Sequence, residues 1–208
     1  MNVGVLALQG SSEPHLAHLR RLGNQPTPVR RVDELEGLSH LVIPGGESTT
    51  LHHLMQLFGL WDPVRRAITD GRLAAFGTCA GAILLGRPDS ERPPRMDVLD
   101  AEVNRNSYGR QIDSFSQSLE LDLPGGPNSA RGVFIRAPRF GALGPDIQVR
   151  ARCGGEPVMI EGRGVLAAAF HPELTEELCV HRYFLDHCQP ASAGHPQRKA
   201  RGLTSSAS

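Results

Sequence analysis

Cys79 lies in the run Phe76-Gly77-Thr78-Cys79-Ala80-Gly81, between two apolar stretches. Small residues around a cysteine at a strand-to-helix junction predict a sharp turn that exposes the sulfur, as in the nucleophile elbow of serine hydrolases. Unpaired N–H groups at the start of the following helix favour the thiolate, which is the nucleophilic form. Cysteine is also common as a small buried apolar residue, so this run alone leaves both interpretations open.

His171 and Glu173 stand in the run Phe170-His171-Pro172-Glu173, directly after the apolar residues 164–169. A thiol nucleophile needs an imidazole to hold its proton, and the imidazole needs a third group to fix its orientation. On extended backbone, which Pro172 favours, a spacing of two points both side chains to one face. Together with Cys79 they predict a Cys-His-Glu triad for acyl transfer.

A third segment, Leu41 to Ile43, reads as a buried strand that breaks into Pro44-Gly45-Gly46-Glu47-Ser48. Acyl transfer needs hydrogen-bond donors where the carbonyl oxygen becomes negative. A diglycine turn can aim main-chain N–H groups there, together with the N–H of Ala80 after the nucleophile. The alternative is an ordinary strand-to-helix turn capped by Ser48 or Thr49.

Taken together, these segments resemble the class I, triad-type glutamine amidotransferases. Within them, the chain is similar to the glutaminase subunits of pyridoxal 5'-phosphate synthase over nearly all of residues 1–189. The connection at 86–97 is shorter than usual in that family. The matching segments are Gly4 to Gly10, Pro44 to Thr50, Gly77 to Gly81, Arg105-Asn106-Ser107-Tyr108-Gly109-Arg110-Gln111, Gly132 to Pro138 and Phe170 to Thr175.

The resemblance implies a glutaminase that hydrolyses L-glutamine to L-glutamate and ammonia, with Cys79, His171 and Glu173 as the catalytic triad. It implies no cofactor and no metal, and a separate synthase subunit as the partner that receives the ammonia in a hetero-oligomer. Gly46 and Ala80 would supply the oxyanion donors. For Arg105, Arg110 and Arg136, a solvated or partner-facing role stays open beside contact with the α-carboxylate of glutamine. The implied glutamine-binding residues are Gly46, Glu47, Ser48, Arg105, Ile135 and Arg136.

Short apolar runs alternate with helical patterns along the chain, which indicates crossover units. We expect an α/β fold with a doubly wound, mostly parallel central sheet flanked by helices. Period-two stretches within residues 98–150 predict some antiparallel additions. One glutaminase domain would occupy residues 1–189, and the Ser-, Ala-, Pro- and basic-rich residues 190–208 predict a disordered tail.

Composition and charge argue against several classes of partner and site. The 208 residues carry 22 basic and 22 acidic side chains, so charge gives no argument for nucleic-acid or membrane partners. No apolar run approaches the roughly 20 residues of a membrane span. The four cysteines lack paired spacing, and a working thiolate needs a reducing compartment, so we expect the cytoplasm. The remaining histidines, including His52 and His53, have no metal-ligand spacing and are expected at the surface.

Two other classes of function stay open. A cysteine peptidase on the same fold would also show an elbow cysteine and a histidine, although the Pro-Gly-Gly-Glu-Ser turn and the His-Pro-Glu run weigh against it. A binding or regulatory subunit that has lost catalysis is the other alternative. The presence of Cys79, His171 and Glu173 weighs against that one.

Overall fold

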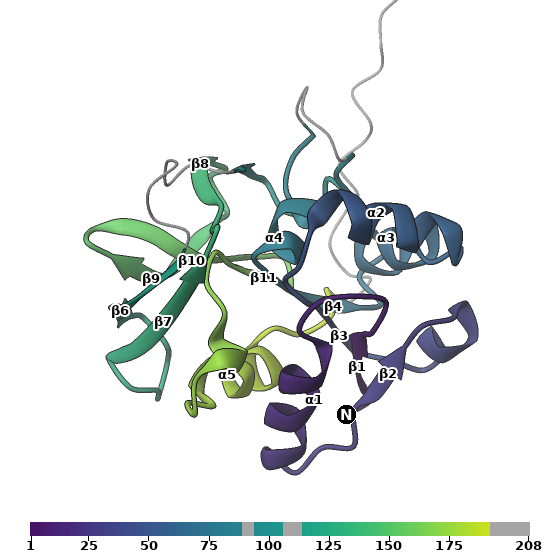
Figure 1. Ribbon diagram of the computed structural model, residues 1–208, viewed down its shortest axis with the longest axis horizontal. Helices are drawn as coiled ribbons and strands as arrows, with labels where there is room; N and C mark the ends of the chain where they lie inside the picture. The colour runs from purple at the N-terminus through teal and green to yellow at the C-terminus, as the bar shows by residue number, and fades with distance from the viewer. Residues whose placement is uncertain (89–93, 106–113, 192–208) are drawn as a thin grey trace, which may run out of the picture.

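The computed structural model describes residues 1–88, 94–105 and 114–191 of the chain. Within them a nine-stranded sheet has the order β2-β1-β3-β4-β11-β10-β9-β6-β7 (Figure 1). Strands β5 and β8 form a separate two-stranded sheet. The strands are β1 Val3–Leu6, β2 Thr27–Val29, β3 His40–Ile43, β4 Ala74–Thr78, β5 Ala101–Asn104, β6 Ser114–Leu121, β7 Ser129–Ile135, β8 Arg139–Leu143, β9 Gln148–Cys153, β10 Glu156–Gly162 and β11 Val165–Ala168.

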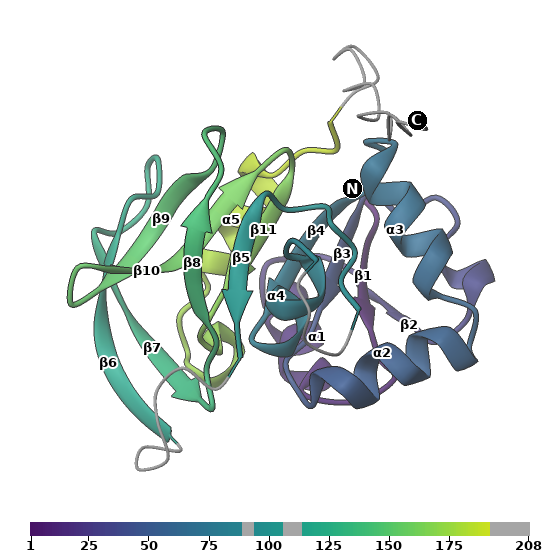
Figure 2. The same cartoon turned by 90° about the horizontal axis from the view of Figure 1, so that it is seen from above.

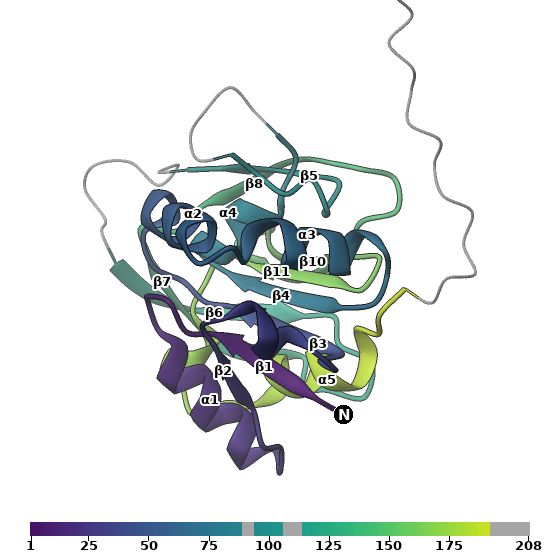
Figure 3. The same cartoon turned by 90° about the vertical axis from the view of Figure 1, so that its right-hand side faces the viewer.

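Five strands, β2, β1, β3, β4 and β11, pair in parallel with one another. All residues of β1, β3, β4 and β11 are buried, as expected where helices cover both faces of a parallel sheet. Helices α1 and α5 lie on one face, and α2, α3 and α4 lie on the other (Figure 3). The helices are α1 Ser12–Arg21, α2 Ser48–Leu57, α3 Trp61–Thr69, α4 Ala80–Leu85 and α5 Cys179–His187, with short 3₁₀ turns at Val32–Leu35 (η1) and Pro172–Leu174 (η2).

The other half of the sheet is antiparallel. Strand β10 pairs with β11 and β9, and β6 joins β9 to β7. These strands continue the same sheet to one side of the parallel half (Figure 2). Buried residues alternate with exposed or half-buried ones along β7 and at the C-terminal end of β6, which is typical of a sheet covered on one face. The predicted fold class and its antiparallel additions are therefore confirmed.

The register of β4 and β11 places the candidate residues at one edge of the sheet. Thr78 lies beside Ala168, and the backbone N–H of Cys79 donates to the carbonyl oxygen of Ala168 at 2.8 Å. Cys79 and His171 thus follow the carboxyl ends of two neighbouring parallel strands, where open α/β sheets bind ligands. From the antiparallel half, Val133 accepts the backbone N–H of His171 at 2.8 Å and so joins β7 to this edge.

The end of the described chain lies against two glycine turns. A Cβ added at Gly71 would overlap the carbonyl oxygen of Ala191, and one at Gly164 would overlap that of Gln189. Of the predicted tail, residues 192–208 lie outside the described residues. In the part of the chain that the structure describes, no helix is long and apolar enough to cross a membrane.

Candidate active site

Cys79 occupies the predicted sharp turn between β4 and α4. Its backbone has φ 48° and ψ −102°, a conformation that costs a residue with a side chain on the order of 1–3 kcal/mol and that clusters at functional sites. The residue is only 6% exposed, so the turn does not expose the sulfur as expected, and its Sγ lies 3.7 Å from the carbonyl oxygen of Ile135. The turn therefore holds the sulfur at the site between the two halves of the sheet.

The glycines on either side of Cys79 allow α4 to lie directly on the sheet. A Cβ at Gly81 would overlap the carbonyl oxygen of Ile43 in β3, and a Cβ at Gly77 would come within 2.6 Å of the backbone of Gly81. Nothing larger than hydrogen fits at these contacts. The Gly-X-Cys-X-Gly spacing is thus a packing requirement that fixes the helix behind the sulfur.

His171 and Glu173 are in direct contact. The Nδ1 of His171 and the Oε1 of Glu173 lie 2.7 Å apart, and the two residues are 5% and 3% exposed. The backbone between them is not extended as expected, because residues Pro172–Leu174 form η2 and His171 precedes its first turn. The short 3₁₀ turn, rather than strand alternation, brings the carboxylate under the ring.

The environment of His171 favours its charged form. Burial alone would lower its pKa, but hydrogen bonds to Cys79 and Glu173 and the charges of both groups outweigh burial and raise the pKa to about 10. The imidazole therefore holds its proton at neutral pH. That state suits the donation of a proton to a departing amine.

The diglycine turn packs against the pair. A Cβ at Gly45 would overlap Cε1 of His171 and would lie 3.4 Å from the Cβ of Cys79, whereas one at Gly46 would overlap the Nε2 of Gln9. Gln9 also donates weakly to the carbonyl oxygen of Glu47, at 3.4 Å. The turn is thus held between the triad and the segment after β1.

Glu47, rather than Ser48 or Thr49, caps α2. Its carboxylate accepts the backbone N–H groups of Thr49 at 3.0 Å and Thr50 at 2.6 Å. Burial alone would raise its pKa, but these hydrogen bonds hold it at about 2. Arg105 lies 3.3 Å from the same carboxylate. The structure therefore places Glu47 and Arg105 together at the start of α2, next to the diglycine turn.

The remaining predicted binding residues fall into three groups. Ser48 is 3% exposed in the first turn of α2. Ile135 presents its carbonyl oxygen to Cys79, and Arg136 follows it with φ 44°, a strained value for a residue with a side chain. Arg110 lies outside the described residues.

The expectation that the remaining histidines lie at the surface is confirmed for His53 and His187, which are exposed, and wrong for the other five that the structure describes. His52 is 8% exposed and meets the ring of Trp61, and His40 is 1% exposed. His15, His18 and His181 are buried behind Glu173 and contact one another. The signal was their position in α1 and α5, because His15 and His18 share a face with the buried Leu16 and Leu19.

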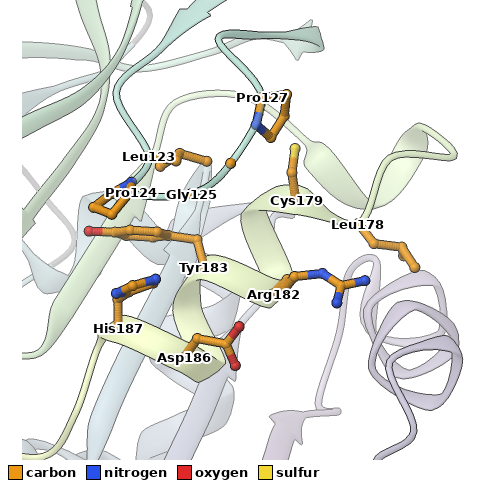
Figure 4. A pocket seen from close by; sticks show the side chains of 11 residues that line it. Leu123, Pro124, Gly125, Pro127, Leu178, Cys179, Arg182, Tyr183, Asp186 and His187 are labelled. Atoms are coloured by element: carbon orange, nitrogen blue, oxygen red, sulfur yellow. The ribbon is translucent and has the colours of Figure 1, made fainter.

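Figure 4 shows a second hollow, a cavity of about 370 Å³ that includes none of the triad residues. The turn at residues 123–127 and the outer face of α5 line it, including Cys179, Tyr183 and His187. Among the described residues no three His, Cys, Asp or Glu side chains are placed to hold a metal ion. The candidate catalytic residues therefore lie around Cys79 and not in this cavity.

The sequence matches the SNO glutamine amidotransferase family over residues 5–190. The chain belongs to that family. Pyridoxal 5'-phosphate synthase subunit PdxT of Thermus thermophilus is 52% identical to this amidotransferase over 186 residues, or 88% of this chain and 96% of the relative. The subunit of the same name from Mycolicibacterium vanbaalenii is 47% identical over 190 residues, or 88% and 95% of the two chains.

Solved structures give the same assignment. A crystal structure described as a glutamine amidotransferase superposes on this amidotransferase with a TM-score of 0.82 and 50% identity, covering 89% of this chain and 97% of the other. PurLQS from Thermotoga maritima, at 16% identity and a TM-score of 0.62 over 88% and 97% of the two chains, shares the fold alone. The predictions of the fold class, of the family and of a glutaminase activity are therefore confirmed.

Proposed function

We propose that the chain is the glutaminase subunit of a pyridoxal 5'-phosphate synthase, working in the cytoplasm with Cys79, His171 and Glu173 as its triad. The observation that carries the assignment of the triad is the contact of His171 with both other members, in a buried setting that keeps the imidazole charged. The similarity to subunits of that name supports the biosynthetic role.

The proposed reaction begins with attack of the Cys79 thiolate on the side-chain carboxamide carbon of L-glutamine. Backbone N–H groups of Gly46 and Ala80 receive the developing oxyanion. His171 donates its proton to the nitrogen, which leaves as ammonia and gives a thioester. The neutral His171 then takes a proton from water as the water attacks the thioester, and L-glutamate leaves. Glu173 holds the imidazole in place throughout.

Glutamine differs from a peptide by its free α-carboxylate and α-ammonium groups. In the proposed site Glu47, with its pKa held at about 2, stays ionised, and Arg105 lies beside it. Arg136 is held in a strained turn next to the Ile135 carbonyl that meets Cys79. We assign the recognition of the free amino acid to these residues with Gly46 and Ser48, which selects glutamine over a protein substrate.

The proposed partner is the synthase subunit that consumes the ammonia. On this chain, the surface that contacts the partner would include the Gln9-Gly10 segment and the turn after Ile43. The two segments are in contact, because a Cβ at Gly10 would overlap the carbonyl oxygen of Gly45 and one at Gly46 would overlap the Gln9 side chain. The segment after β1 therefore controls the peptide that supplies an oxyanion donor. Loss of one such donor costs roughly a hundred- to a thousandfold in rate, so partner binding can switch the enzyme on.

The test is glutamate release by the chain alone and with the synthase subunit added. We expect weak activity alone, a strong rise with the partner, and complete loss of activity in Cys79→Ala. Cys153→Ser is the matched control, because that cysteine ends β9, which pairs with β10 and β6 and not with the strands that carry the triad, and the rate should be unchanged. Equal rates with and without partner would refute the switch, and hydrolysis of casein in place of glutamine would indicate the peptidase alternative.

A further inference from the structure

Three buried histidines form a row behind the triad carboxylate. His15 Nδ1 lies 2.8 Å from His181 Nε2, and His181 Nδ1 lies 3.3 Å from His18 Nδ1. At the other end of the row, His15 Nε2 lies 3.4 Å from Glu173 Oε2 and 3.3 Å from the hydroxyl of Thr78. The row thus connects Glu173, through α1 and α5, to His18.

The histidine row is almost inaccessible to solvent. His15 and His181 are fully buried, His18 is 4% exposed, and the Phe76 ring meets His15 and His181 edge-on. Burial lowers the pKa of all three, that of His181 to about 3, so each imidazole is neutral near pH 7. A neutral imidazole has one N–H donor and one acceptor nitrogen.

Glu173 is the group that needs a donor from this row. Its Oε1 meets His171, whereas its Oε2 is fully buried and has no hydrogen bond of good geometry among the described residues. Leaving a buried charged acceptor without a donor is costly. The nitrogen of the row nearest to Oε2 is Nε2 of His15, at 3.4 Å, and a small rotation of the ring would align its N–H with this oxygen.

An ionised Glu173 decides the tautomer of every ring in the row. A lone pair on His15 Nε2 would repel the carboxylate, so this nitrogen carries the proton and Nδ1 is the acceptor. His181 must then donate from Nε2 to His15, which leaves its Nδ1 as an acceptor. His18 then donates its single N–H from Nδ1 to His181 in preference to the backbone carbonyl of Thr175, because the buried carboxylate at the other end sets the order of the row. All N–H bonds of the row therefore point toward Glu173.

We propose that His15 is a positioning residue of the glutaminase, which donates from Nε2 to the second oxygen of Glu173 and is held in that tautomer by His181 and His18. This inference rests on the proposed role of Glu173 in the triad. With donors on both oxygens, the carboxylate cannot rotate about its terminal bond, and His171 stays aligned between Glu173 and Cys79. With one donor removed, the carboxylate loses that constraint.

The tautomer itself can be measured without any activity assay. In the full chain labelled with ¹⁵N in the histidine rings, the expected signals at neutral pH are a protonated Nε2 and an unprotonated Nδ1 for His15. His15→Gln identifies the signals by their disappearance. An unprotonated Nε2 on His15 would overturn the proposal, whatever the enzyme does.

Kinetics test the consequence in the complex with the synthase subunit. His15→Leu removes the donor at similar volume, and we expect kcat to fall on the order of tenfold or more with KM for glutamine little changed. His15→Gln should restore most of kcat, because its amide nitrogen can reach the position of Nε2. The control is His40→Gln, a buried histidine at the opposite end of β3 that donates to the carbonyl oxygen of Cys188 and should leave kcat unchanged.

Two outcomes distinguish a failure of the His15 proposal from a failure of the proposed triad. If His15→Leu and His15→Gln lose kcat equally while both keep their melting temperatures, His15 acts through shape and the positioning role is wrong. If Cys79→Ala or His171→Ala retains full activity, the triad itself is wrong. The ¹⁵N measurement still decides the tautomer in either case.

Discussion

His171 is the residue whose charge depends most on its neighbours. Its pKa of about 10 results from Cys79 and Glu173 acting against burial. Because the folded pKa exceeds the ordinary value of 6.5, protonated His171 stabilises the fold below that value. This stabilisation decreases as the pH rises toward 10. The same proton is the one proposed to reach the leaving ammonia, so stability and turnover should both decline on the alkaline side.

Glu173→Gln tests the link between the pKa of His171 and turnover. Because the Glu173 charge raises the pKa of His171, its removal should lower that pKa and move the alkaline limb of kcat to lower pH. The rate at the optimum should fall less than in His171→Ala, since the imidazole remains. Glu176→Gln, an exposed carboxylate paired with Arg21, is the control. An alkaline limb unmoved by Glu173→Gln would refute the assigned role of the carboxylate.

Helix α4 depends on contacts that only glycine permits. In Gly81→Ala the new Cβ meets the carbonyl oxygen of Ile43, which is backbone and cannot rotate away. Overpacking of this kind typically costs about 1–3 kcal/mol, more than the better helix propensity of alanine returns. We expect a melting temperature lower by several degrees and a loss of turnover, because the helix directly follows Cys79.

Gly154→Ala is the comparison for that variant. Gly154 has φ 57° and open space where a Cβ would be added, so alanine there tests backbone strain without a clash. Its melting temperature should change less, and its turnover should stay the same. If the two variants were equally stable and active, close packing of α4 on β3 would not be what the Gly-X-Cys-X-Gly spacing provides.

The elements show where sequence reasoning succeeds and where it stops. The strand-to-helix turn at Cys79 was predictable because small residues and flanking apolar runs leave few other conformations. The contact of His171 with Glu173 was predictable, but its 3₁₀ backbone was not, because alternation presumes a strand. The histidine row escaped prediction for a different reason. His15 and His181 lie 166 positions apart, and only the docking of α1 and α5 on the same face of the sheet joins them.

At the scale of the whole molecule, the site is assembled from both halves of the sheet. The parallel half contributes Cys79 and the diglycine turn, whereas β7 of the antiparallel half brings the Ile135 carbonyl to the sulfur. The strand β11 belongs to both, since it pairs in parallel with β4 and antiparallel with β10. Relative movement of the halves would therefore disturb the triad directly, which links the stability of the fold to turnover.

The C-terminal residues test how far the domain extends. The carbonyl oxygens of Gln189 and Ala191 lie against Gly164 and Gly71, so contacts with the rest of the described chain continue two residues past the boundary expected at 189. Removal of residues 192–208, in which Leu203 is the one large apolar residue, should change the melting temperature by no more than about one or two degrees. Removal of residues 189–208 also uncovers the two turns and frees the end of α5, so the melting temperature of this shorter chain should fall further.

Because α5 carries His181, the longer deletion should also lower kcat, whereas the shorter one should not. Thermal unfolding and glutamate release of the two truncated chains measure both effects. Equal losses in the two would show instead that the stabilising contacts come from residues after 191.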